Sequence, residues 1–276
     1  MVTQDRADIA ARAGELLERL RATRPLVQNI TNFVSMDTVA NALLALGASP
    51  AMVHSIEESA DFAARADALN VNTGTLSKPF LEGGESAATA AHMLGRPWVL
   101  DPVGVGGGKF RNEAVLRLLR HRPAVIRGNA SEIMGVARVA GLNAQAAAPR
   151  GVDAAHTTDE AFVTARLVAR HHLCVVAATG AVDLITDGER VLRFANGHEL
   201  MTRVTALGCA LSGVVAAFCA VGDDAFEAAA SAIAVYGVAG EMAAEKASRP
   251  GSYRVAFMDM LDAITPADVS ARLKVL

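Results

Sequence analysis

The stretch RPWVLDPVGVGGG (residues 96–108) contains, in order, an apolar run, an aspartate followed by proline, and a glycine-rich loop. A short apolar run that ends in turn-forming residues is typical of a buried β-strand. The same pattern recurs along the chain, where PAMVH runs into SIEES, ALNV into NTGTLS, PAVI into RGNASE and LCVVA into ATGAVD. We therefore predict a series of buried strands, each followed by a polar loop.

Segments with helical periodicity separate these strands, at residues 37–46, 58–67, 84–94, 112–121 and 158–171. Strands that alternate with helices are typical of an α/β fold with a mainly parallel sheet and helices on both faces. Asp187-Gly188 breaks the alternation, because β-like runs flank it and this dipeptide is a hairpin turn signal. Two or more helices follow the hairpin, at 205–221 and 225–247.

The length of 276 residues fits one large α/β domain, which we expect to span residues 1–276. Its charged beginning, residues 1–20, is predicted to form an amphipathic surface helix and lacks the apolar core of a signal peptide. The polar segment 142–157 is predicted to be a surface loop rather than a linker between domains.

The composition restricts the class of protein. Hydrophobic residues make up 52% of the chain, so a substantial core can form, and the net charge of −3 with no basic patch makes nucleic acid a poor candidate partner. Three cysteines without CxxC spacing argue against a disulfide framework or a structural zinc site. They indicate a reducing compartment, and we expect a cytoplasmic protein.

One uncharged stretch, 204–222, has the length of a membrane-spanning helix. Its glycines, its serine and its many alanines keep it weakly hydrophobic, and no second span follows. We therefore predict a buried helix in this stretch and no membrane partner.

In a sheet of this kind, ligands bind outside the carboxyl ends of the strands. The polar clusters after the predicted strands all reach that edge, which would bring together Asp101, Arg127, Asn129, Glu132 and Thr179. Cys209 joins them if its helix points toward the same crevice.

Each of these motifs has more than one interpretation. GVGGGKF (residues 104–110) fits neither a P-loop nor a dinucleotide fingerprint, so the loop either passes close to phosphates or only turns the chain. Asp101 is either a turn-forming carboxylate or a Mg²⁺ ligand. Asn129 and Glu132 form either a helix cap or a second arm of a metal site opposite Asp101.

The order of the motifs is more specific than any one of them. The segments PLVQNITNFVSMDTVANALLALGASPAM, LNVNTGTLS, VLDPVGVGGGKFR, VIRGNASEI, ATGAVDLITDG, LMTRVTALGCALSGVVAAF and PGSYRVAFMDML occur in that order. Together they resemble the hydroxyethylthiazole kinase family of the ribokinase-like superfamily. The resemblance covers about residues 20–265.

The resemblance implies ATP-dependent, Mg²⁺-dependent phosphorylation of the hydroxyl of 5-(2-hydroxyethyl)-4-methylthiazole, in the thiazole salvage branch of thiamine biosynthesis. It also implies a homotrimer with the thiazole sites at subunit interfaces. Carried over by motif, the residues on the thiazole side are Asn32, Met52, Gly74 and Ala206. Those that bind ATP are Arg127, Thr179 and Gly180, and those that hold Mg²⁺ are Asp101 and Glu132.

The segment ALGC (residues 206–209) carries the groups nearest to the chemistry. The resemblance makes Cys209 the proton acceptor and aims backbone N–H groups, including that of Gly208, at the transferring phosphoryl group. We expect the helix N-terminus to lower the pKa of the Cys209 thiol. Ala206 and Ala181 depart from the residues common in the family, and a Cβ at residue 206 disfavours positive φ there.

Two other classes remain in competition. One is another kinase or a hydratase-type repair enzyme of the same superfamily, which the ITN and GASPAM segments and the cysteine disfavour. The other is a non-catalytic α/β binding protein, which has no need for the combination of Asp101, Asn129, Glu132 and Cys209.

Overall fold

A computed structural model describes residues 5–142 and 156–276. The surface loop expected at 142–157 falls almost wholly on residues 143–155, which lie outside the described residues, as do the first four residues of the expected N-terminal helix.

The described residues form one sheet of eight strands in the order β2-β1-β3-β4-β5-β6-β7-β8. The strands are β1 (Leu26–Ile30), β2 (Ser49–Ala51), β3 (Ala68–Asn72), β4 (Trp98–Asp101), β5 (Val125–Asn129), β6 (Val175–Thr179), β7 (Asp183–Thr186) and β8 (Val191–Phe194). All pairs from β2 to β6 are parallel, whereas β7 is antiparallel to both of its neighbours. The predicted α/β class with a mainly parallel sheet is confirmed, and so is the hairpin at Asp187-Gly188.

The helices are α1 (Arg6–Thr23), α2 (Met36–Leu46), α3 (Ser59–Ala63), α4 (Lys78–Met93), α5 (Lys109–Leu119), α6 (Ala130–Val139), α7 (His156–His172), α8 (Leu207–Val221), α9 (Ala225–Lys246), α10 (Pro250–Ala263) and α11 (Pro266–Arg272). A short 3-10 helix, η2 (Glu199–Arg203), precedes α8.

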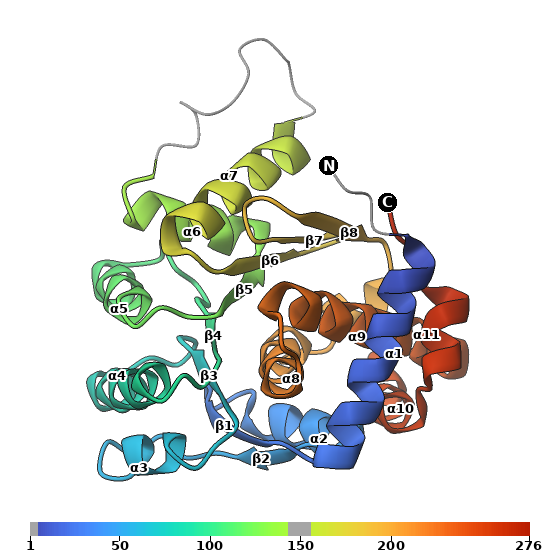
Figure 1. Cartoon of the computed structure of the whole chain (residues 1–276), viewed down its shortest axis with the longest axis horizontal. Helices are drawn as coiled ribbons and strands as arrows, with labels where there is room; N and C mark the ends of the chain where they lie inside the picture. Colours follow the sequence, from blue (N-terminus) through green and yellow to red (C-terminus); the bar gives the residue numbers. More distant parts are fainter. Residues whose placement is uncertain (1–4, 143–155) are drawn as a thin grey trace.

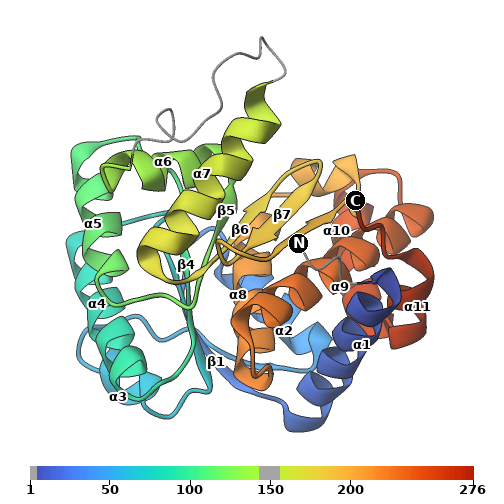
Figure 2. The ribbon, with the colours of Figure 1, turned by 45° about the horizontal axis from the view of Figure 1, so that its top comes forward.

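Helices cover both faces of the sheet (Figure 1). On one face lie α3 to α7, and on the other lie α8 and α9, with α2 beside α8 against β2 and with α1, α10 and α11 outside them; Figure 2 shows the same division after a turn of the molecule. Each face has its own hydrophobic core, one around α4, α5 and α7 and a larger one around α8 and α9.

The helix α8 is the central element of the larger core. It contacts β1, β3 and β4, and its N-terminus lies at the same edge of the sheet as the carboxyl ends of those strands. The buried helix predicted for 204–222 is therefore confirmed, and no helix in the described residues is both long and apolar enough to cross a membrane.

Some boundaries differ from those predicted. The helix α4 begins at Lys78, earlier than expected, because Ser77 caps it through Phe80 N–H and Pro79 occupies its first turn. Gly83 and Gly84 obscure this start in the sequence, and Gly83 is needed because a Cβ there would lie 2.2 Å from the His54 carbonyl oxygen. The helix α3 is shorter than the predicted 58–67, since the chain turns after Ala63 toward β3.

Candidate functional site

The carboxyl ends of the parallel strands carry the residues that sequence analysis singled out. Along the sheet from β2 to β6 these are Met52, Asn32, Gly74, Asp101, Arg127 with Asn129, and Thr179 with Gly180. The N-terminus of α8 brings Cys209 to the same edge, since Asn32 Nδ2 donates to Cys209 Sγ at 3.3 Å. The expected convergence on one rim is therefore present.

Asp101 is enclosed by the molecule, with 1% of its surface exposed. Its Oδ2 accepts hydrogen bonds from Asn72 Nδ2 at 2.7 Å and from Ser212 Oγ at 2.8 Å. Its Oδ1 has no partner within the described residues. Burial raises the pKa of this carboxyl to about 6, although the positive charge of Arg127 opposes the shift.

The surroundings of Cys209 differ from the expectation of a lowered pKa. Burial, with the Asp101 carboxylate adding to it, raises the pKa of the thiol, while hydrogen bonds from Asn32 and Asn72 and the charge of Arg127 act in the opposite direction. The expected lowering of the thiol pKa by the helix N-terminus is thus wrong, because desolvation of the sulfur outweighs the favourable contacts.

Arg127 connects β5 and β6 to the start of α8. Its guanidinium donates to Thr179 Oγ1 at 2.6 Å and to the carbonyl oxygen of Gly208 at 2.8 Å. A Cβ at residue 208 would lie 3.2 Å from Arg127 Nη1, so glycine permits this close approach. The buried Nε of Arg127 has no partner within the described residues, which leaves donor capacity for an anion.

The first turn of α8 presents free backbone donors. Its first intrahelical bond runs from Ala210 N–H to the Ala206 carbonyl at 2.8 Å. The N–H groups of Leu207, Gly208 and Cys209 consequently have no acceptor inside the helix. Such a terminus favours anions through both these donors and the helix dipole.

Ala206, the N-cap of α8, has a φ of 70° and a ψ of −5°. Its Cβ therefore does not prevent the left-handed conformation that glycine adopts readily. This conformation costs a non-glycine residue about 1 kcal/mol.

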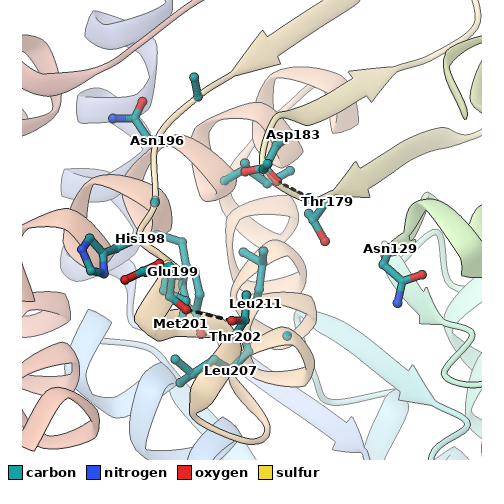
Figure 3. A pocket seen from close by; sticks show the side chains of 18 of the residues that line it. Asn129, Thr179, Asp183, Asn196, His198, Glu199, Met201, Thr202, Leu207 and Leu211 are labelled. Carbon is teal, nitrogen blue, oxygen red and sulfur yellow. Dashed lines mark hydrogen bonds between the residues drawn. The ribbon is translucent and has the colours of Figure 1, made fainter. Parts of the chain in front are cut away.

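A pocket of about 660 Å³ opens between β6, β8, η2, the first turns of α8 and the middle of α9 (Figure 3). Thr179, Asn129 and Asp183 lie on one side of it, and Asn196, His198 and Met201 on another. Leu207 and Leu211 of α8 form apolar wall between them. The volume suits a nucleotide-sized ligand, and Ala181 provides no polar group in the wall.

Asn129 and Glu132 form a capping box at the N-terminus of α6, which confirms one of the two interpretations offered for this pair. Asn129 Oδ1 accepts from Glu132 N–H, and Glu132 Oε2 accepts from Asn129 N–H, each at 2.9 Å. The other oxygen, Glu132 Oε1, accepts from Gly104 N–H of the glycine-rich loop at 3.2 Å. Each carboxylate oxygen of Glu132 keeps a second lone pair, so the cap leaves acceptor capacity on this side chain.

In the described residues there is no group of three or more His, Cys, Asp or Glu side chains arranged to hold a metal ion. Mg²⁺ commonly binds to proteins through one or two carboxylates and keeps several waters. The unpartnered Oδ1 of Asp101 is the group available to it.

Three side chains of the site were not recognised from the sequence. Asn72 and Ser212 hold Asp101, and Tyr236 of α9 donates to the Leu207 carbonyl at 2.7 Å and so supports the start of α8. Ser212 had a signal available, because it follows Cys209 by three residues and so shares its face of the helix. Asn72 follows the predicted strand ALNV and begins the quoted NTGTLS loop.

Comparisons with known proteins agree on one family. A model of the "HK: Hydroxyethylthiazole kinase family" matches residues 17–267. A hydroxyethylthiazole kinase of Cereibacter sphaeroides is 52% identical over 263 residues, which are 95% of this chain and 98% of that protein.

Solved structures give the same result. The structure of a hydroxyethylthiazole kinase protein from Pyrococcus horikoshii OT3 superposes with a TM-score of 0.88 and 40% identity, covering 96% of this chain and 98% of that chain. A ribokinase-like superfamily protein from Enterococcus faecalis V583 shares the fold, with a TM-score of 0.56 and 14% identity over 94% of this chain and 84% of that chain.

Proposed function

The chain belongs to the hydroxyethylthiazole kinase family, and we propose that it transfers the γ-phosphate of ATP to the hydroxyl of 5-(2-hydroxyethyl)-4-methylthiazole. Family membership makes it a kinase of thiazole salvage in thiamine biosynthesis. The observation that supports the chemistry best is the rim itself, where an arginine, a carboxylate and a thiol lie beside free helix N–H groups and a nucleotide-sized pocket.

We assign ATP to the pocket of Figure 3, with its phosphates toward Arg127, Thr179 and Gly180. The guanidinium of Arg127 is a planar donor suited to phosphate oxygens. The N–H groups of Gly208 and Cys209 would receive the transferring phosphoryl group, whose negative charge they stabilise at no cost of reorganisation.

Asp101, whose Oδ1 has no partner within the described residues, and Glu132 are the carboxylates that would hold Mg²⁺. The ion neutralises charge on the phosphates when bound. Glu132→Gln keeps a side chain of the same shape but removes a negative charge, and its single carbonyl oxygen can accept from only one of Asn129 N–H and Gly104 N–H. We expect it to raise the Mg²⁺ concentration for half-maximal activity by about tenfold, the size of one weak charge contact. An unchanged Mg²⁺ dependence would leave Glu132 with its cap alone.

The thiazole alcohol is assigned to the other end of the rim, between Asn32, Met52, Gly74 and Ala206. Cys209 is the proposed proton acceptor for its hydroxyl. A raised thiol pKa suits this assignment if proton loss is late, as it is in a loose transition state, because positioning then contributes more than basicity.

We further propose that the protein is a homotrimer with this end of the rim at the subunit interface. The loops that carry Asn32 and Met52 expose large apolar side chains: Phe33 and Val34 are each 62% exposed and Ile56 is 45% exposed. Light scattering tests the assembly, and a monomer with full activity would contradict it.

An ADP-release assay with the thiazole alcohol, with and without Mg²⁺, tests the function. We expect turnover that needs both. A pyrimidine alcohol serves as the control substrate, since preference for it would assign the protein to another branch of the superfamily. ATP consumption that does not depend on any alcohol would contradict the proposal.

A further inference from the structure

A chain of side-chain amides runs from the buried carboxylate to the thiol. Asn72 Oδ1 accepts from Gly74 N–H at 2.8 Å and from Asn32 Nδ2 at 3.0 Å, while Asn72 Nδ2 donates to Asp101 Oδ2 at 2.7 Å. Asn32 Nδ2 also donates to Cys209 Sγ at 3.3 Å. Asn72 is 1% exposed and Asn32 is 6% exposed, so water does not compete for most of these bonds.

Backbone donors fix the direction of every bond in this chain. A backbone N–H can only donate, so Gly74 N–H identifies Oδ1 of Asn72, and Ser35 N–H, which donates to Asn32 Oδ1 at 3.1 Å, identifies the oxygen of Asn32. The amide nitrogen of Asn32 must therefore face Cys209. The sulfur consequently stands as the acceptor of an N–H hydrogen bond, which favours its deprotonated form.

Gly74 makes room for this arrangement. A Cβ at residue 74 would lie 2.5 Å from Asn32 Cβ and 2.7 Å from Asn32 Nδ2. Gly74 is not among the residues with positive φ, so the requirement for glycine is one of space and not of backbone conformation. Any side chain at residue 74 would push the Asn32 amide away from its place beside Cys209.

We propose that Asn72 is a positioning residue for the phosphoryl transfer. Its amide holds Asn32 as a hydrogen-bond donor to Cys209 and also holds Asp101, so that Cys209 and Asp101 keep fixed positions relative to each other. Gly74 serves the same contact by leaving space for Asn32. The role in phosphoryl transfer rests on the proposed function, whereas the hydrogen bond from Asn32 to Cys209 can be tested without it.

Charged and titratable groups reach Cys209 from several elements. The Asp101 carboxylate faces it from β4, the Arg127 guanidinium from β5 and the Tyr236 hydroxyl from α9, while Asn32 and Asn72 are its hydrogen-bonding neighbours from the ends of β1 and β3. Gly74→Ala displaces the Asn32 amide and leaves the three ionisable groups in place, so a change that it causes can be attributed to the Asn32 contact. Asn72→Ser also removes the hydrogen bond to Asp101, so the two variants are compared.

The test measures the pH midpoint of alkylation of Cys209 by iodoacetamide, read from the modified peptide by mass spectrometry. Cys174 and Cys219 do not interfere, since burial raises the pKa of each to about 12. We expect Asn72→Ser and Gly74→Ala each to shift the midpoint upward by about one pH unit, which is the loss of one hydrogen bond to a charged group. The midpoint is used rather than the rate, because a change in access alters the rate without moving the midpoint.

Asn70→Ser is the matched control. Asn70 is equally buried, lies two residues earlier on the same face of β3, and its amide donates to Asn29 Oδ1 at 3.1 Å rather than toward Cys209. We expect no shift from it. An equal shift in Asn70→Ser, or an unmoved midpoint in a folded Asn72→Ser or Gly74→Ala protein, would overturn the proposal; the two variants break the contact from opposite sides, so either one suffices.

Kinetics provide a second measurement. We expect Asn72→Ser to lower kcat by up to about tenfold, in proportion to the thiolate lost, with the KM for ATP unchanged. If the wild-type protein phosphorylates no thiazole alcohol, the proposed function fails while the alkylation shift still tests the contact. If kcat is unchanged despite a shifted midpoint, Asn72 does not position Cys209 for the reaction.

Discussion

The two ends of the rim are built differently: the proposed nucleotide end, at Arg127 and Thr179, and the proposed acceptor end, at Asn32 and Met52. The nucleotide end is a pocket of about 660 Å³ with apolar walls, and it opens between elements of one chain. At the acceptor end, Asn32, Asn72 and Asp101 bond to one another and leave little unsatisfied besides Asp101 Oδ1. The loops around that end expose Phe33 and Val34.

The difference indicates two ways of preparing a site. The nucleotide end has its shape and its free donors before any ligand arrives. The acceptor end has its polar groups fixed by hydrogen bonds, but the apolar side chains of its loops are exposed in the single chain. This exposure is expected if, as proposed, a second subunit completes the site. Substitutions at the nucleotide end should therefore change the kinetics for ATP, and substitutions of residues that contact the thiazole at the acceptor end should change the KM for the alcohol but not that for ATP.

Arg127→Met should give the largest effect. It removes a charge that bonds both Thr179 and the Gly208 carbonyl, at the point where the phosphates are assigned. We expect kcat/KM for ATP to fall by about 10²–10³-fold, as for loss of one preorganised donor. Thr179→Val, which removes only a hydroxyl, serves as the milder control, and steady-state kinetics measures both. An equal rise in the KM for the thiazole would mean that Arg127 maintains the structure of both ends of the rim and does not act on ATP alone.

Cys209→Ala should retain measurable activity, with kcat lower by about 10²-fold, the low end of the range for general-base assistance. Cys209→Asp should remain active, because Asn32 can donate to a carboxylate as it does to sulfur. Both are measured by ADP release.

Cys219→Ala is the control for the cysteine series, since Cys219 is buried farther along α8 and should leave kcat unchanged. A folded but inactive Cys209→Asp protein, or a phosphorylated Cys209 trapped during turnover, would contradict the role of proton acceptor.

The sheet and most of its helices could be predicted from apolar runs and periodicity, but β1 could not. Its sequence LVQNI contains Gln28 and Asn29, which look unsuited to a central strand, yet both are fully buried. Their amides bond inside the molecule, Gln28 to the carbonyl oxygens of Val53 and Ser59 and Asn29 to that of Val27. The partners of Gln28 lie 25 and 31 residues away in sequence, so they leave no local signal.

The candidate site shows the same limit. Residues at strand ends, such as Asp101 and Arg127, could be predicted because parallel strands bring their ends to one edge. The pKa of Cys209 could not, because it depends on how deeply the sulfur is buried and on the nearby Asp101 carboxylate. Neither quantity follows from the position of a cysteine at a helix N-terminus.

Met52→Ala should raise the KM for the thiazole by about tenfold, since a thioether contact with an aromatic ring contributes up to about 1.5 kcal/mol. Met52 follows β2 at the acceptor end and is not among the residues that line the nucleotide pocket, so the KM for ATP should stay unchanged. Met52→Leu, which keeps most of the volume, is the control. Equal effects on both substrates would indicate a packing defect and remove the division between the two ends.

Ala206→Gly should have the smallest effect, and its sign is the informative part. Ala206 lies between the two ends, at the start of α8, with a φ of 70°. Glycine removes the cost of this conformation but gains freedom in the unfolded chain, so we expect a net stabilisation of up to about 0.5 kcal/mol. For a protein of this size that corresponds to a rise in Tm of up to about 2 °C.

Ala210→Gly, one turn later on the same helix, is the matched comparison and should instead destabilise the protein by about 1 kcal/mol, because residue 210 has ordinary helical geometry. Calorimetry on the two variants measures the difference. If both lower Tm equally, Ala206 carries no strain, and the turn that aims the N–H groups of α8 at the phosphoryl group is relaxed with alanine as it stands. If only Ala206→Gly raises Tm, the backbone at Ala206 is strained in the folded protein. The strain then lies in the turn at the start of α8, between the two ends of the rim.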